Sequence, residues 1–227
     1  MDVKELNQIF ERFELNPEKE RELALLVGKE DSWRRKQRDQ SDLLGEINPR
    51  CDQRFLELGC GPLRFGVGLI EWLNEGCYTG VDINERSISE GKALITQLGL
   101  GAKKPELFCL EDFGLSALEH GSFDLIWAYN VLIHLSEAKL VNAFYSVSRL
   151  LKGNGRAIVT LRLSQQGGFV QTGKWLEFPI CAAPFFWYAK IADELGMKFT
   201  AIKPISDIQH CAFKGAPCYY LASLTLK

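Results

Sequence analysis

A short apolar run that ends in a glycine turn constrains this chain most: Phe55–Leu58, followed by Gly59, Cys60 and Gly61. The run predicts a buried strand, and the glycines let a ligand approach the backbone closely because no Cβ is in the way. Asp82 closes the next strand-like run along the chain. A carboxylate at the tip of a neighbouring strand suits the hydroxyls of a ribose. Together these features predict a site for a cofactor that carries a nucleoside.

Strand-like and helix-like segments alternate after this point. Strands are expected at 55–58, 77–81, 106–110, 123–129 and 156–161, and helices at 63–74, 84–98 and 136–151. A last helix is expected at 185–195, with further strands at 198–203 and 217–226. Such alternation is typical of βαβ units that build a parallel sheet buried on both faces. The prediction is therefore an α/β fold with a seven-stranded sheet.

The first 50 residues differ from the rest, because they are rich in charge and poor in β-branched residues. Apolar residues recur at helical spacing between Val3 and Phe13, and Pro17 is placed to open a second helix. The basic run at 33–38 predicts a solvated helix face, or else a contact with an anionic substrate or a cofactor carboxylate. Residues 1–50 are thus expected to form an N-terminal helical cap.

The length of the chain suits one α/β domain with an elaboration, which we expect to span residues 51–227. With 227 residues, 46% hydrophobic and 25% charged, the composition is that of an ordinary globular protein. The alternation breaks after residue 161, and glycines and aromatic residues gather without clear periodicity at 164–178, within a longer segment at 164–188. This segment is predicted to be an insertion.

The bulk properties exclude several classes of function. A net charge of −2 and a pI near 6.0 argue against nucleic-acid binding, which favours a basic excess, so a small-molecule partner is expected. The longest apolar stretch is too short to span a bilayer, so no membrane association is expected. The seven cysteines form no CxxC pair, which predicts neither a disulfide framework nor a metal site. With no signal peptide visible, we expect a cytoplasmic location.

Several segments at predicted strand ends carry a recognisable pattern in a fixed order. They are residues 56–61, 78–84, 110–113, 123–130 with 134–135, and 150–155. Over about residues 54 to 162 the chain resembles the class I S-adenosylmethionine-dependent methyltransferases. The resemblance implies a Rossmann-like, doubly wound sheet that is mostly parallel, with a C-terminal antiparallel strand. It also implies S-adenosyl-L-methionine as cofactor and methyl transfer as the reaction.

The resemblance assigns the amino-acid end of the cofactor to the glycine turn. Gly59, Cys60 and Gly61 would pass under it, and Glu57 would hold the ammonium group or brace the loop. Many members of the family carry a third glycine where this chain has Leu63. The full fingerprint of a pyrophosphate-bearing dinucleotide site is therefore absent, whereas S-adenosylmethionine has no pyrophosphate.

The resemblance assigns the adenosine end of the cofactor to the next two strand tips. Asp82 would accept both ribose hydroxyls, although it could instead cap the following helix. Ile83 would lie against the adenine face. Asp112 would accept the adenine amino group and Phe113 would flank the ring, with Glu111 as the acid if the register slips by one.

Asn130 and His134 follow the fourth predicted strand, where ligands of open α/β sheets bind. Asn130 is expected to contact the cofactor near the reacting methyl group. His134 is a candidate general base, because its unperturbed pKa lies near neutrality. The alternative is a histidine that packs and hydrogen-bonds locally.

The sequence thus predicts a methyltransferase that acts on a small molecule, such as a polar metabolite or a saccharide, by direct methyl displacement. Two other readings stay open at this point. One is a nicotinamide-dependent oxidoreductase, which would want a fuller glycine fingerprint. The other is a methyltransferase-like protein that binds the cofactor without catalysing a reaction.

Overall fold

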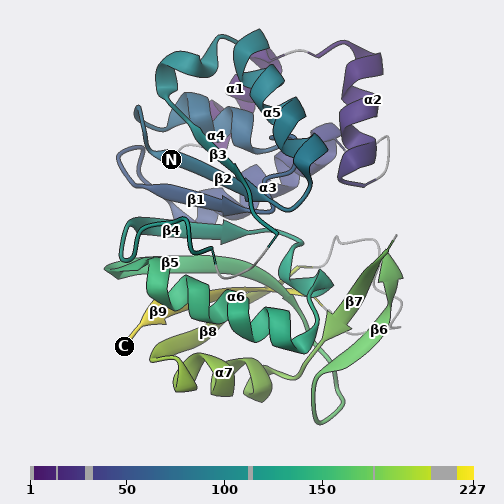
Figure 1. The fold of residues 1–227 in the computed structure, drawn as a ribbon, viewed down its shortest axis with the longest axis vertical. Helices are drawn as coiled ribbons and strands as arrows, with labels where there is room; N and C mark the ends of the chain where they lie inside the picture. Colours follow the sequence, from purple (N-terminus) through teal and green to yellow (C-terminus); the bar gives the residue numbers. More distant parts are fainter. Residues whose placement is uncertain (1–2, 14, 29–32, 112–114, 176, 206–218) are drawn as a thin grey trace. The chain divides into compact units, whose positions relative to one another are not determined.

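The computed structural model describes residues 3–13, 15–28, 33–111, 115–175, 177–205 and 219–227. The predicted residues Asp112 and Phe113 lie outside these ranges. The chain forms two compact units, Met1–Glu111 and Asp112–Lys227 (Figure 1).

The first unit carries the N-terminal helices and a parallel three-stranded part of the sheet. Its elements are α1 (Val3–Arg12), α2 (Pro17–Leu26), α3 (Trp33–Ile47), β1 (Phe55–Leu58), α4 (Gly66–Trp72), β2 (Tyr78–Asp82), α5 (Glu85–Gln97), η1 (Leu100–Lys103) and β3 (Glu106–Cys109). β2 pairs in parallel with β1 on one side and with β3 on the other. Every residue of β1 is buried, as expected for a strand covered on both faces.

The predicted N-terminal helices are present, and they pack on the rest of the first unit. The Phe10 ring lies 5.7 Å from the Phe65 ring and fills the space that a Cβ on Gly68 would need. The expectation of a solvated face for the basic run is wrong at Trp33 and Gln37, which are both buried. The side-chain amide of Gln37 donates to the backbone carbonyl of Arg64, at 2.7 Å.

The second unit continues the sheet and adds a separate two-stranded ribbon. Its elements are β4 (Phe123–Ala128), η2 (Leu132–His134), α6 (Glu137–Leu150), β5 (Leu151–Arg162), β6 (Val170–Trp175), β7 (Phe178–Ala182), α7 (Phe185–Glu194), β8 (Met197–Ile205) and β9 (Tyr219–Leu226). β4 and β5 are parallel, whereas β9 is antiparallel to both β5 and β8. The helices α6 and α7 lie on the same face of this part of the sheet (Figure 1).

The strand order of the seven-stranded sheet is β3-β2-β1-β4-β5-β9-β8. The chain winds outward in one direction through β1 to β3 and in the other from β4. The sheet is mostly parallel, with β9 as its antiparallel member. This arrangement confirms the predicted α/β, Rossmann-like, doubly wound class with its N-terminal helices.

α4 and β5 begin at other residues than predicted. α4 begins at Gly66 rather than at Leu63, because Leu63 has a left-handed φ of 64° and cannot continue a right-handed helix. β5 begins at Leu151 rather than at residue 156, and its pairing register with β4 shifts where residues 153–155 lie. Ser136 stands at the N-cap of α6, where that helix was predicted to begin, and its side chain makes no capping hydrogen bond.

The segment at 164–188, predicted to be an insertion, contains the antiparallel pair β6 and β7. Figure 1 shows this pair as a ribbon separate from the main sheet of the second unit. Much of its surface is exposed, so its strands carry no alternation of buried and exposed residues for the sequence to reveal. Of the helices that the structure describes, none has the length and apolarity that crossing a bilayer requires.

Candidate functional site

The glycine loop after β1 takes the conformation that only glycine adopts readily. Gly59 has a φ of 70° and Gly61 a φ of 55°, both in the left-handed region. The backbone N–H groups of Gly59 and Cys60 donate to the carbonyl of Val81, at 2.7 and 3.1 Å. The loop is therefore fastened to the end of β2, the strand that carries the candidate ribose acid.

Asp82 joins this loop directly. Its Oδ2 accepts a hydrogen bond from the backbone N–H of Gly61 at 2.8 Å, and its Oδ1 accepts one from that of Asn84 at 2.8 Å. Burial raises the pKa of Asp82, while these backbone donors act in the opposite direction. Each carboxylate oxygen keeps a further lone pair, so both oxygens can also accept a ribose hydroxyl.

The alternative of Asp82 as a helix cap is not what the structure shows. Asn84 is the N-cap of α5, and its Oδ1 accepts from the backbone N–H of Ser87 at 3.2 Å. Asp82 therefore braces the glycine loop, and its contact with a ribose stays a prediction.

Leu63 takes a glycine-like conformation at the point where the family pattern has glycine. Its side chain is fully buried against two glycines. A Cβ added to Gly66 would lie 2.7 Å from the Cδ2 of Leu63, and one added to Gly91 would lie 3.1 Å from its Cγ. A left-handed φ costs energy for a residue with a Cβ, and here this packing holds it in place. The loop is thus closed by a packed leucine rather than by a flexible glycine.

Val27, the C-cap residue of α2, lies against the same loop. A Cβ built on Gly61 would stand only 2.6 Å from the Cγ1 of Val27. The close approach explains why position 61 requires glycine for space as well as for its φ. It also makes the end of α2 part of the wall around the loop.

Glu57 is a buried carboxyl group beneath the loop, only 4% exposed. The hydroxyl of Tyr78 on β2 donates to its Oε2 at 2.5 Å. Burial raises the pKa of Glu57 to about 8, although the hydrogen bond from Tyr78 and the charge of Arg64 act in the opposite direction. Glu57 therefore has a partner within the fold, and its contact with the cofactor ammonium stays a prediction.

The two remaining candidates of the first unit differ in exposure. Ile83 is 41% exposed directly after Asp82, which leaves an apolar side chain at the tip of β2. Cys60 is buried, and burial raises the pKa of its thiol well above the usual value. Cys60 is thus a protonated packing residue of the loop rather than a nucleophile.

In the second unit, Asn130 follows β4 in a strained conformation. Its φ is 58°, and its backbone N–H donates to the hydroxyl of Thr160 on β5 at 2.7 Å. Non-glycine residues in this region of φ often stand at functional sites. The contact of Asn130 with the cofactor stays a prediction.

His134 ends η2 and contacts the β6–β7 ribbon. Its Nδ1 lies 3.0 Å from the carbonyl oxygen of Pro179, and its ring lies 6.3 Å from that of Phe178. A carbonyl only accepts, so Nδ1 must carry the proton, and Nε2 is the basic nitrogen of the neutral ring. Burial lowers the pKa of His134, and the bond to Pro179 partly offsets this.

The structure brings Glu57, Gly61 and Asp82 together in the first unit. Glu57, the glycine loop, Asp82 and Ile83 belong to the first unit, and Asn130 and His134 to the second. Sequence reasoning missed Tyr78, Val27, Thr160 and Pro179. Only Tyr78 left a signal: it stands two residues before Gly80, the register partner of Glu57, and a buried acid needs a donor.

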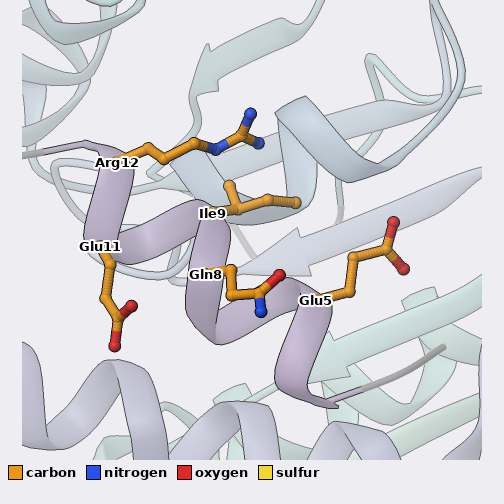
Figure 2. Close-up of a pocket in the computed structure, with 5 residues that line it drawn as sticks. All are labelled: Glu5, Gln8, Ile9, Glu11 and Arg12. Atoms are coloured by element: carbon orange, nitrogen blue, oxygen red, sulfur yellow. The ribbon is translucent and has the colours of Figure 1, made fainter.

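A pocket at α1 holds none of the predicted residues. Figure 2 shows its lining, which comes from one helix: Glu5, Gln8, Ile9, Glu11 and Arg12. It has no element in common with the glycine loop and suggests no chemistry. Among the described residues, His, Cys, Asp and Glu side chains form no group of three able to hold a metal.

Comparison of the sequence with family models identifies a methyltransferase domain. Residues 55–155 match the family model described as methyltransferase domain. That range begins with β1, and it includes the glycine loop, Asp82 and the segment from β4 to the start of β5. No curated protein matches the sequence. The match favours a methyltransferase over a nicotinamide-dependent oxidoreductase.

Solved structures share the fold at low sequence identity. A protein from Pyrococcus horikoshii OT3 is 18% identical with a TM-score of 0.64, over 87% of this chain and 92% of that one. An S-adenosylmethionine-dependent methyltransferase from Methanosarcina mazei is 15% identical with a TM-score of 0.61, over 81% and 97%. The 1,6-didemethyltoxoflavin-N1-methyltransferase of Burkholderia thailandensis, solved with bound 1,6-didemethyltoxoflavin and S-adenosylhomocysteine, is 16% identical with a TM-score of 0.61, over 87% and 79%.

Proposed function

We propose that the chain is a class I S-adenosylmethionine-dependent methyltransferase and that it methylates a small polar molecule by direct displacement. The match of residues 55–155 to the methyltransferase domain supports the family. The observation that carries the proposal is the hydrogen bond between Asp82 and the N–H of Gly61. This bond joins the candidate ribose acid to the loop under the amino-acid end of the cofactor. A chain that had lost its cofactor would have no use for this arrangement.

The residues of the first unit fit S-adenosylmethionine. The left-handed glycines leave the backbone of the loop without side chains, and Asp82 offers two acceptor oxygens for a ribose. Ile83 offers an apolar side chain beside them for the adenine ring. Asp112, Phe113 and Asn130 keep the cofactor roles that the family pattern implies, as part of the proposal.

When bound, the cofactor supplies a methyl group already activated by a sulfonium. The task that remains for the protein is to bind, align and exclude water. Holding two reactants in attack geometry can lower the barrier by roughly 7–11 kcal/mol. The braced glycine loop supports such alignment because its conformation is fixed before a ligand arrives.

His134 is the group that we propose as general base. At neutral pH a lowered pKa keeps the ring uncharged, and the bond to Pro179 makes Nε2 the nitrogen that accepts a proton. The proton would come from the hydroxyl or amine of the acceptor as its bond to the methyl group forms. A positioned base contributes typically about 10²–10⁴-fold to the rate.

The net charge of the chain and one structural relative both favour a small molecule as the methyl acceptor. The Burkholderia thailandensis enzyme, solved with a small heterocycle bound, shares the fold over most of this chain. The net charge of −2 also gives no general attraction to nucleic acid.

The test is isothermal titration of the protein with S-adenosylmethionine and with S-adenosylhomocysteine. We expect micromolar binding that Asp82→Ala weakens at least tenfold, which corresponds to about 1.4 kcal/mol. Asp52→Ala is the matched control, because Asp52 is an exposed aspartate of the same unit that pairs with Arg50 at 2.9 Å. It should bind like the wild type. Absence of binding by well-folded wild-type protein would overturn the proposal.

A further inference from the structure

The β6–β7 ribbon is anchored to β5 by one buried arginine. Arg162 is only 4% exposed, and its Nη1 donates to the hydroxyl of Thr172 on β6 at 2.7 Å. Thr172 in turn donates to the carbonyl of Ile180 on β7 at 3.0 Å. One threonine hydroxyl therefore connects β5 to both strands of the ribbon.

The main chain of Arg162 holds the far end of β7. Its carbonyl accepts from the N–H of Ala183 at 3.2 Å and from the hydroxyl of Tyr188 at 2.8 Å. Arg162 thus bonds to β6 through its side chain and to the end of β7 through its backbone carbonyl. This double attachment fixes the path of β7 relative to β5.

The residue next to Ile180 on β7 is Pro179, whose carbonyl receives the Nδ1–H of His134 at 3.0 Å. Hydrogen bonds therefore link Arg162 through Thr172 to Ile180, and the backbone of β7 joins Ile180 to Pro179, which holds the histidine ring. The nitrogen of a histidine that carries the proton is set by the hydrogen bond that the ring makes. The position of β7 consequently decides which nitrogen of His134 is basic.

We propose that Arg162 and Thr172 are positioning residues that hold His134 in the Nδ1–H tautomer. They act through the carbonyl of Pro179 and leave Nε2 as the basic nitrogen. The proposal rests on the proposed role of His134 as the base, and it assigns a purpose to the insertion in the second unit. No bond is made or broken by these two residues.

The test is a ¹⁵N nuclear magnetic resonance spectrum of the imidazole nitrogens, which needs no knowledge of the acceptor. The chain has only 3 histidines, so a His134→Gln variant assigns the signals of His134. In the wild type, above the pKa of His134, we expect the Nδ1–H tautomer. Thr172→Val should lose the hydroxyl bridge and shift the signals toward the Nε2–H tautomer, and Thr172→Ser should restore the wild-type pattern.

The control variant is Thr96→Val, which removes a hydroxyl that donates to the carbonyl of Lys92 at 3.1 Å in α5 of the first unit. It should leave the His134 signals unchanged. Thr172 is exposed, so its substitution is expected to leave the fold intact. An unchanged Nδ1–H tautomer in folded Thr172→Val would overturn the proposal.

Failure of the positioning role and failure of the proposed function give different results. S-adenosylhomocysteine binding should be equal in the wild type and in Thr172→Val, because neither residue of the anchor belongs to the cofactor loop. If the wild type does not bind S-adenosylhomocysteine, the proposed function is overturned, whereas the tautomer measurement still tests the positioning role of Arg162 and Thr172.

Discussion

At the scale of the residue, the most consequential feature is the carboxyl group of Glu57 inside the sheet. In the described part of the chain its hydrogen-bond donor is the hydroxyl of Tyr78, and burial dominates the shift of its pKa. A buried carboxylate without full compensation costs stability unless it takes up a proton. The protein keeps this group directly beneath the cofactor loop, which points to a use that outweighs its cost.

We expect Glu57→Gln to remove a pH-dependent loss of stability. The pKa of Glu57 in the folded protein is about 8, above the roughly 4.3 of an unfolded glutamate. A group whose pKa is raised by folding contributes stability that is fully present below its pKa in the unfolded chain. This contribution is lost as the pH rises through its pKa in the folded protein. The wild type should therefore lose stability relative to the variant from about pH 4.3 to about pH 8.

The measurement is the midpoint of urea unfolding across that pH range. Glu194→Gln is the control, because this glutamate on α7 is 58% exposed and forms a weak pair with Lys190 one turn away, at 3.7 Å. Its curve should run parallel to that of the wild type. A parallel curve for Glu57→Gln as well would show that burial does not shift the titration of Glu57.

At the scale of the element, α2 is held in place by ion pairs as well as by apolar packing. Of its residues only Leu23 and Ala24 are buried. Lys19 pairs with Glu90 on α5 at 2.7 Å, and Glu22 pairs with Arg86 on the same helix at 3.1 Å. Since Val27 at the end of α2 lies against Gly61, these pairs also fix one wall of the glycine loop.

We expect Glu90→Gln to loosen α2. The Lys19–Glu90 pair is mostly shielded from water, with 29% and 21% of the two side chains exposed. The bond to Glu90 is the largest cause of the raised pKa of Lys19. An ion pair of this kind contributes roughly 0.2–1 kcal/mol, so amide hydrogen exchange in α2 should accelerate up to about fivefold.

The matched control is Glu75→Gln, which breaks an exposed pair with Lys104 in the same unit. Exchange in α2 should not respond to that change. Equal exchange rates in α2 for the wild type and for Glu90→Gln would mean that apolar contacts alone hold the helix. Added salt should also reduce the difference between wild type and variant, because it screens the pair.

At the scale of the whole molecule, ligand binding and folding are linked. The chain forms two compact units, and the candidate cofactor residues are distributed between them in the sequence. A ligand that binds only the folded protein stabilises it by an amount set by its concentration relative to the Kd. The thermal stability of the full chain is therefore a direct readout of the assigned cofactor.

We expect S-adenosylhomocysteine at about 100 times its Kd to stabilise the protein by about 2.7 kcal/mol. For a chain of this length, that corresponds to a rise in Tm of about 5–10 °C. Differential scanning fluorimetry measures the rise. In Asp82→Ala the rise at the same concentration should be about half as large, since a tenfold weaker Kd leaves about 1.4 kcal/mol.

The nicotinamide cofactor NAD serves as the control ligand and should leave the Tm unchanged. A rise with NAD and none with S-adenosylhomocysteine would contradict the cofactor assignment. That result would instead support a nicotinamide-dependent oxidoreductase, the alternative that the sequence left open.

The sequence by itself determined the class of fold and the position of the glycine loop. The order of strands and helices follows from local patterns, and so does the turn at Gly59 and Gly61. Such features depend on residues close together in the chain, so their signals survive in the sequence. Asp82 was found for the same reason, because it ends a strand and precedes a helix.

Tertiary structure alone decided how the site residues are held. Leu63 keeps a left-handed φ only because its side chain is packed against Gly66 and Gly91. Glu57 finds its donor on a neighbouring strand, and His134 finds a carbonyl 45 residues away, at Pro179. These contacts join segments that are distant in the chain, and their energies come from burial and from hydrogen-bond geometry, which no local pattern of residues records.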